Sequence, residues 1–243
     1  MNYSICGIAY KRNYNRKIRI CKAVAVKFLF CVMFDSLKWL FFDVGYTLVN
    51  EDEVWRVRCR EQSECSEAVS LGLSETDIYN EIVNASVSFK PQFNTLIEKY
   101  GFKYKAPYRS EYEQLYPCVP SLLEYLSSKY RIGIIANQKS GLYERLCEFG
   151  IADYLALTVS SSDCGYSKPD IRIFDYALDR CGCDPLETVM IGDRLDNDIL
   201  PAKTVGMKTI WVKQGFGGIQ TPVLPEHYPD LSVLTIDGLA EIL

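Results

Sequence analysis

Short apolar runs alternate with helical patterns along most of the chain, and this alternation constrains the fold more than any other feature. Each run is continuously apolar, which is typical of strands buried on both faces of a parallel sheet. The regular alternation of strands and helices predicts an α/β fold, with a doubly wound (Rossmann-like) parallel sheet. The predicted strands are residues 37–43, 131–136, 155–160, 188–192 and 208–212, and the helices between them include residues 142–149, 169–181 and 198–205.

One long segment, residues 51–116, interrupts this alternation and carries helical patterns only. Residues 51–72 are polar and predicted to be helical, Ser74 and Asp77 have the spacing of a helix N-terminal cap, and Gly101 is a natural helix stop. We therefore expect a small helical domain inserted after the first strand. The predicted organisation is a core of residues 33–50 and 117–243, a helical insertion of residues 51–116, and a basic extension of residues 1–32.

The extension differs from the rest of the chain in charge. Residues 1–33 carry seven of the 27 Lys and Arg residues and no acidic residue. Their apolar stretch, residues 23–34, is shorter than the ~20 residues that span a bilayer, and no small-residue cleavage site follows it. Met33 instead begins a segment typical of a natural start. We expect residues 1–32 to be poorly ordered or mis-annotated, with targeting or membrane-surface binding as the alternative.

Composition argues against several classes of function. The formal charge of −4 disfavours general nucleic-acid binding, and the missing spanning segment disfavours stable membrane insertion. The ten cysteines form no CxxC pair, so we expect reduced thiols in a cytoplasmic protein. The single histidine, His227, excludes multi-histidine metal sites and is expected to be exposed in a Pro-rich tail segment. No feature indicates an oligomeric state.

Polar side chains follow four of the predicted strands. Asp43 ends the first, Asn137 follows the second, Lys168 follows the third, and Asp193 and Asp198 follow the fourth. In doubly wound sheets, ligands bind at the carboxyl ends of the strands, so these side chains should converge. Carboxylates are the ligands that Mg²⁺ prefers, a carboxylate can form an acyl-phosphate, and a lysine can neutralise transferring oxygens. The set predicts a magnesium site that holds a phosphoryl group.

Four segments in this order, "FFDVGYTLV", "RIGIIAN", "GYSKPD" and "GDRLDND", resemble the haloacid dehalogenase superfamily over residues 34–243. The inserted helical segment resembles the helical cap of its subfamily I. The resemblance implies that Asp43 is the nucleophile and a magnesium ligand and that Lys168 balances charge. It further implies that Asp193 and Asp198 bind or orient the metal, Mg²⁺, and that the substrate is a small phosphorylated molecule.

Two positions depart from the family pattern. Its phosphatases usually carry a second Asp, a general acid, two residues after the nucleophile, where this chain has Gly45. The backbone carbonyl of Gly45 can still bind magnesium, but a general acid typically contributes ~10²–10⁴ in rate. The family also usually presents a Ser or Thr hydroxyl to the phosphate, where this chain has Ala136. Asn137, the next residue, can offer its amide and backbone N–H to the phosphate instead.

These departures leave three interpretations open. The favoured one is a magnesium-dependent phosphatase that acts on good leaving groups or takes an acid from the cap. Candidates for that acid are Glu51, Asp52 and Glu53, although a solvated acidic helix start is the simpler interpretation. The second is a catalytically impaired binding or regulatory protein with the same fold. The third is a haloacid dehalogenase, which needs no metal and is disfavoured by the intact "GDRLDND" segment.

Overall fold

A computed structural model describes residues 34–243, and Lys38–Glu241 form one compact unit. The expectation about residues 1–32 lies outside the described residues. In the part of the chain that is described, no helix is both long enough and apolar enough to cross a membrane.

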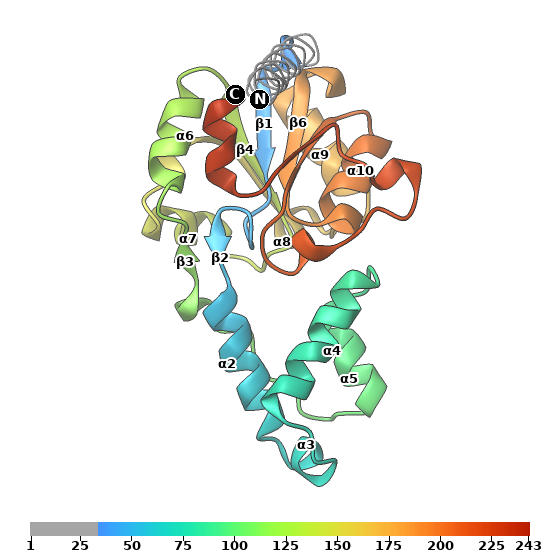
Figure 1. The fold of residues 1–243 in the computed structure, drawn as a ribbon. Coiled ribbons are helices and arrows are strands. Elements are labelled where there is room, and N and C mark those ends of the chain that lie inside the picture. The colour runs from blue at the N-terminus through green and yellow to red at the C-terminus, as the bar shows by residue number, and fades with distance from the viewer. Residues whose placement is uncertain (1–33) are drawn as a thin grey trace, which may run out of the picture. The chain divides into compact units, whose positions relative to one another are not determined.

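The core of the structure is a six-stranded parallel sheet with the order β5-β4-β1-β6-β7-β8 (Figure 1). All five predicted strands are present, so the predicted α/β parallel fold is confirmed. The edge strand β8 is short and half exposed, and for that reason it lacks the continuous apolar pattern of the others. The strands are β1 (Trp39–Phe42), β4 (Arg131–Ala136), β5 (Leu155–Ser160), β6 (Thr188–Gly192), β7 (Lys208–Val212) and β8 (Leu231–Val233).

Helices flank this sheet. One apolar cluster joins Trp39 and Phe41 of β1 to Phe174 and to Ala202, which lie on two of the helices. The strand order brings the carboxyl ends of β1 and β6 side by side, because these two strands pair directly. The helices of the sheet domain are α6 (Val119–Ser127), α7 (Leu142–Glu148), α8 (Ser161–Cys164), α9 (Arg172–Cys181) and α10 (Leu200–Thr204).

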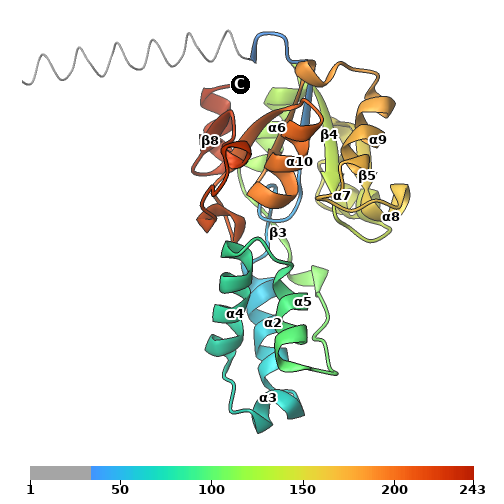
Figure 2. The ribbon, with the colours of Figure 1, turned by 90° about the vertical axis from the view of Figure 1, so that its right-hand side faces the viewer.

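The segment after β1 contains four helices, shown together in Figure 2. They are α2 (Asp52–Ser63), α3 (Ser66–Ser70), α4 (Glu75–Val87) and α5 (Gln92–Tyr100). Their apolar residues form a cluster that also includes Tyr46 and Phe216, which lie outside residues 51–116. The Ser74–Asp77 capping box begins α4, and Gly101 ends α5 in the left-handed conformation, both as predicted. A short antiparallel pair, β2 (Val49–Asn50) and β3 (Gln114–Leu115), leads the chain into and out of these helices. The division at residues 51 and 116 remains a prediction.

Residues 51–72 are helical as predicted, and they divide into two helices because Cys65 adopts an extended conformation between α2 and α3. Two other local predictions are wrong. The helix expected at residues 198–205 is a π-helical turn, Leu195–Ile199, followed by α10, so Asp198 lies inside the turn. His227 is buried, with 6% of its surface exposed, because its ring packs on Phe89.

Candidate active site

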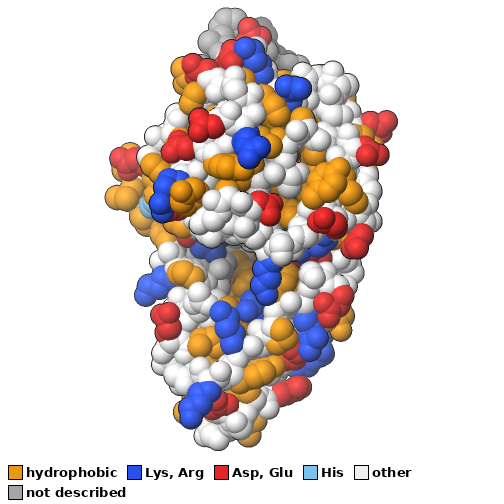
Figure 3. All heavy atoms as spheres, turned by 180° about the vertical axis from the view of Figure 1, so that it is seen from behind, with side chains coloured by type: hydrophobic (Ala, Val, Ile, Leu, Met, Phe, Trp, Pro, Cys, Tyr) orange, Lys and Arg blue, Asp and Glu red, His pale blue; other side chains and the backbone are white. Residues whose placement is uncertain are grey.

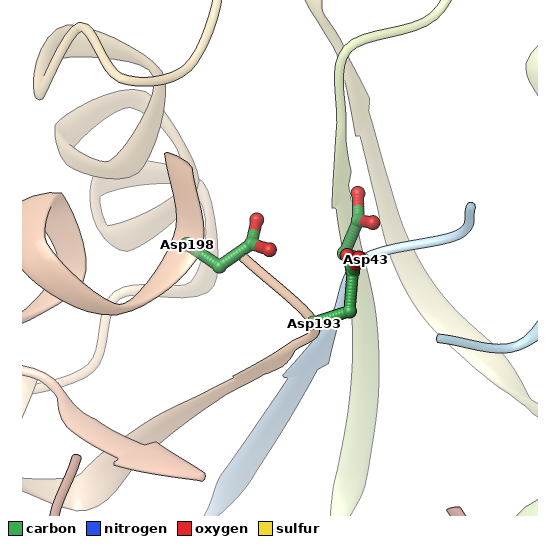
Figure 4. A group of neighbouring side chains, drawn as sticks. All are labelled: Asp43, Asp193 and Asp198. Atoms are coloured by element: carbon green, nitrogen blue, oxygen red, sulfur yellow. The ribbon is translucent and has the colours of Figure 1, made fainter. Parts of the chain in front are cut away.

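Three carboxylates converge at the carboxyl ends of β1 and β6. Asp43 follows β1, Asp193 follows β6, and Asp198 projects from the π-helical turn toward both (Figure 4). One oxygen from each lies within 4.8 Å of the others. Asp193 and Asp198 are buried, whereas the side chain of Asp43 keeps 14% of its surface exposed. The predicted convergence of these three residues is therefore observed.

Lys168 joins two of the three carboxylates. Its Nζ donates hydrogen bonds to Oδ1 of Asp43 and to Oδ1 of Asp198, each at 2.6 Å. Burial alone would lower the pKa of this lysine, but the charges of Asp198 and Asp43 outweigh burial and raise it. Lys168 is therefore a fixed cation between the two carboxylates.

The cluster still carries an excess of negative charge. Burial, together with the charges of Asp198 and Asp43, raises the pKa of Asp193 well above its ordinary value. Burial also raises the pKa of Asp198, against the opposing charge of Lys168. Among the described residues of the cluster, three carboxylates face one ammonium group, which is an environment suited to a divalent cation with oxygen ligands.

Two glycines allow the carboxylates to approach the backbone. A Cβ atom on Gly192 would lie 2.5 Å from Oδ2 of Asp198, and a Cβ on Gly217 would lie 2.5 Å from Oδ2 of Asp193. Contacts this short do not occur between real side chains. The glycine that ends β6 is therefore part of the geometry of the site, although it bears no functional group.

Asn137 holds the backbone of Lys168. Its Nδ2 donates to the carbonyl of Lys168 at 2.8 Å, and its Oδ1 accepts from the N–H of Lys168 at 2.7 Å. The amide was predicted to bind phosphate, but its oxygen and one of its two N–H groups are used to orient the lysine. Asn137 also lines the cavity, and its second amide N–H takes no part in these two hydrogen bonds.

A cavity of about 200 Å³ lies in front of the carboxylates. Its lining includes the predicted residues Asp43, Gly45, Asn137, Lys168, Asp193 and Asp198, together with the candidate acid Glu51. Sequence analysis assigned no role to the seven other lining residues, although one lies in the "FFDVGYTLV" segment and two lie in "GDRLDND". These are Tyr46, Trp55, Gln92, Gln138, Arg194, Asn197 and Phe216.

Glu51 differs from the two acidic residues that follow it. It lines the cavity with 8% of its surface exposed, whereas Asp52 and Glu53 line a separate surface cavity and Glu53 pairs with Arg56. Burial raises the pKa of Glu51 to about 7, against the opposing effect of its hydrogen bonds with Tyr108 and Trp55. The expectation of a solvated acidic helix start is therefore wrong for Glu51.

The Glu51 carboxyl fills the space that a side chain at position 45 would need. A Cβ atom on Gly45 would lie only 2.9 Å from Cδ of Glu51 and closer still to Oε1. On its other side, Glu51 accepts a hydrogen bond from Nε1 of Trp55 at 3.0 Å. The carboxyl is thus held from α2, next to the loop that follows Asp43.

A buried chain of polar groups continues from Glu51. The hydroxyl of Tyr108 lies 2.6 Å from Oε1 of Glu51 and 2.6 Å from Oε1 of Glu113. Nε of Arg145 lies 3.3 Å from Oε2 of Glu113. The pairing of β2 with β3 explains this arrangement, since Asn50 lies opposite Gln114 and the next residues, Glu51 and Glu113, therefore face each other. Sequence analysis did not single out Tyr108 or Glu113.

Comparisons with known proteins agree with this fold. Residues 40–212 match the family model of haloacid dehalogenase-like hydrolases. The chain is 27% identical to a glyceraldehyde 3-phosphate phosphatase of Methanocaldococcus jannaschii over 85% of this chain and 97% of that one. A glyceraldehyde 3-phosphate phosphatase of Methanothermobacter thermautotrophicus is 35% identical, over 51% of this chain and 55% of its own length.

A solved structure shares the fold as well. The putative HAD-hydrolase YfnB of Bacillus subtilis superimposes with a TM-score of 0.64, at 23% identity, over 85% of this chain and 98% of that one. The resemblance in four short segments, the parallel sheet with its converging carboxylates, and the family match over most of the chain agree with one another. The chain belongs to the haloacid dehalogenase-like hydrolases.

Proposed function

We propose that this protein is a magnesium-dependent phosphatase that acts on a small phosphorylated molecule through an aspartyl-phosphate. The observation that carries this proposal is the position of Asp43. One of its oxygens is held by Lys168 at 2.6 Å, and the side chain remains partly exposed to a cavity. A carboxylate fixed at one oxygen and accessible at the other is arranged for nucleophilic attack. Two curated relatives are named as phosphatases, which supports the same chemistry.

Each predicted residue has a role in this proposal. Asp43 attacks phosphorus, Lys168 binds one oxygen of Asp43 and neutralises phosphoryl oxygens, and Asn137 holds the lysine in place. Magnesium would be held by Asp43, Asp193, Asp198 and the backbone carbonyl of Gly45. When bound, it would supply positive charge to the transferring phosphoryl oxygens.

The cavity supports a small substrate. Its volume of about 200 Å³ has room for a compact phosphorylated molecule, and the ring systems of Trp55 and Phe216 form part of its wall. Acidic and basic side chains are interspersed on the face shown in Figure 3, which favours a small molecule over nucleic acid as the partner. The seven cysteines of the described residues are free thiols, which supports a reducing, cytoplasmic setting.

The test is magnesium-dependent release of phosphate by the full chain, with 4-nitrophenyl phosphate, acetyl phosphate and a sugar phosphate as substrates. Asp43→Asn should lower the rate at least about 10³-fold, because the amide cannot act as the nucleophile. The matched control is Asp179→Asn, which removes an exposed acid of α9 that does not line the cavity and should leave the rate unchanged.

Two outcomes would overturn the proposal. Phosphate release by Asp43→Asn at the wild-type rate would show that Asp43 is not the nucleophile. If the wild type releases no phosphate from any substrate but its melting temperature rises when Mg²⁺ is added, the alternative is favoured. The protein would then be a regulatory protein that binds metal without catalysis.

A further inference from the structure

Hydrolysis of an alkyl phosphate needs a proton at the leaving oxygen. Without that proton the departing group is a strongly basic alkoxide, and a positioned proton donor typically contributes ~10²–10⁴ in rate. Four carboxyl groups line the cavity, on Asp43, Glu51, Asp193 and Asp198. Asp43 and Asp198 are bound to Lys168, and Asp193 belongs to the same cluster. Glu51 lies outside this cluster.

The position of Glu51 suits transfer of a proton near Asp43. Its carboxyl occupies the space next to Gly45, two residues after Asp43, and both residues line the same cavity. Glu51 is the residue before helix α2, but its side chain does not cap that helix. The hydrogen bond from Trp55 holds Oε2. Together with the contact of Tyr108 at Oε1, this bond fixes the carboxyl at the wall of the cavity.

Counting hydrogens places a proton on this carboxyl. The hydroxyl of Tyr108 has one hydrogen, yet it lies 2.6 Å from an oxygen of Glu51 and 2.6 Å from an oxygen of Glu113. It can donate to only one of them, so the other short contact needs a hydrogen that comes from a carboxyl group. Arg145 places its positive charge beside Glu113 and favours the ionised form there. Burial raises the pKa of both Glu51 and Glu113, and the charge of Arg145 opposes that rise only at Glu113, which favours Glu51 as the carboxyl that holds the hydrogen.

We propose that Glu51 is the general acid of this active site, supplied from the start of the cap helix in place of a residue at position 45. The inference depends on the proposed phosphatase function. In the first step Asp43 forms a bond to phosphorus, the bond from phosphorus to the leaving oxygen breaks, and that oxygen takes the proton of Glu51. The products are an alcohol, the Glu51 carboxylate and the aspartyl-phosphate.

In the second step the same group acts as a base. Water forms a bond to phosphorus, the bond between phosphorus and Asp43 breaks, and Glu51 takes the proton released by water. Phosphate leaves, and both carboxyl groups return to their starting forms. Gln at position 51 can neither give nor take this proton, but it can donate an N–H to Tyr108 and accept from Trp55 as the protonated acid does. Glu51→Gln should therefore fold normally.

The test compares leaving groups in the pre-steady state. With 4-nitrophenyl phosphate, whose leaving group needs little protonation, Glu51→Gln should release one equivalent of nitrophenol within about tenfold of the wild-type rate. It should then turn over slowly, with the phosphoryl group retained on Asp43. With glycerol 1-phosphate, release of one equivalent of alcohol should slow by ~10²–10⁴. Asp179→Asn is the control and should behave as the wild type with both substrates.

A second pair of variants moves the carboxyl group from position 51 to position 45. Gly45→Asp alone should be poorly active because its side chain meets the Glu51 carboxyl, whereas Gly45→Asp combined with Glu51→Gly has room for the new side chain. The double variant should react with glycerol 1-phosphate at least tenfold faster than Glu51→Gly. This comparison keeps the inference testable even where Glu51→Gln is unstable.

The outcomes separate the two proposals. If Glu51→Gln slows both substrates equally, or slows neither, the role of Glu51 is overturned. If Asp43→Asn is inactive in the same experiment, the phosphatase function remains in place. An active Asp43→Asn would overturn the phosphatase proposal itself.

Discussion

Two groups of carboxyls lie beside one cavity, and each is held by a different kind of partner. In the first group, the ammonium of Lys168 donates to Asp43 and Asp198. In the second, Glu51 and Glu113 share the single hydroxyl of Tyr108. A cation stabilises carboxylates in their ionised form, whereas a shared hydroxyl leaves room for one carboxyl to keep its proton.

The difference shows how one type of side chain can serve opposite chemical purposes. Ionised carboxylates beside a lysine are suited to attack phosphorus and to bind a metal ion. A carboxyl held by Tyr108 and Trp55, away from the lysine, is suited to give up a proton. The partners of each carboxyl, rather than its residue type, decide which of these it does.

Removing the cation should have the largest effect on stability. Lys168→Met leaves the buried Asp198 and the partly exposed Asp43 without their shared partner, so the free energy of unfolding in EDTA should fall by about 3–5 kcal/mol. Urea unfolding at pH 7.5 measures this change. Lys139→Met, which removes an exposed lysine, should change it by less than about 0.5 kcal/mol. An equal loss in both variants would show that the cluster does not depend on Lys168.

Removing the protonated carboxyl should have a smaller effect that depends on pH. The pKa of Glu51 is raised by burial to about 7, so the folded protein keeps this proton at pH values where the unfolded chain has lost it. The wild type therefore loses stability as the pH rises from about 5 to 8, whereas Glu51→Gln lacks this loss. Relative to the wild type, the variant should gain about 2–3 kcal/mol over that range.

Urea unfolding in EDTA at pH 5 and pH 8 measures the gain of Glu51→Gln. If the free energies of unfolding of the variant and the wild type differ by the same amount at both pH values, Glu51 is ionised throughout. The contrast between the two groups of carboxyls would then fail.

Removing the shared hydroxyl should have the smallest effect. Tyr108→Phe deletes the group that lies between Glu51 and Glu113, so the free energy of unfolding at pH 7 should fall by about 1–2 kcal/mol. Tyr112→Phe is the matched control, because Tyr112 lies on the same segment and is 39% exposed. Identical stability of the two variants would show that Tyr108 does not link the carboxyls.

The sequence was sufficient to predict the sheet and the cluster around Lys168. Both depend on strong local signals, since continuous apolar runs mark buried strands and the ends of parallel strands meet at one edge. Asp43, Lys168, Asp193 and Asp198 could therefore be placed together without coordinates. The break between α2 and α3 could not be predicted, because it depends on the extended backbone of Cys65 alone.

The second group of carboxyls could not be predicted from the sequence. Glu51 precedes Asp52 and Glu53, and three adjacent acids are indistinguishable from a solvated helix start until their burial is known. Glu113 faces Glu51 only because two strands of two residues each pair in one register, and strands this short leave no pattern in the sequence. The contact of Tyr108 with both carboxyls follows from the same pairing.

The absence of a side chain at Gly45 also constrains how related chains can diverge. Because a larger residue at this position meets the Glu51 carboxyl, substitutions at positions 45 and 51 are not independent. An evolutionary change that moves the carboxyl from position 51 to position 45 takes two substitutions. The chain between them has either no carboxyl at these positions or two carboxyls that meet each other. Homologous chains should therefore show epistasis between these positions, with a small residue at one accompanying an acidic residue at the other.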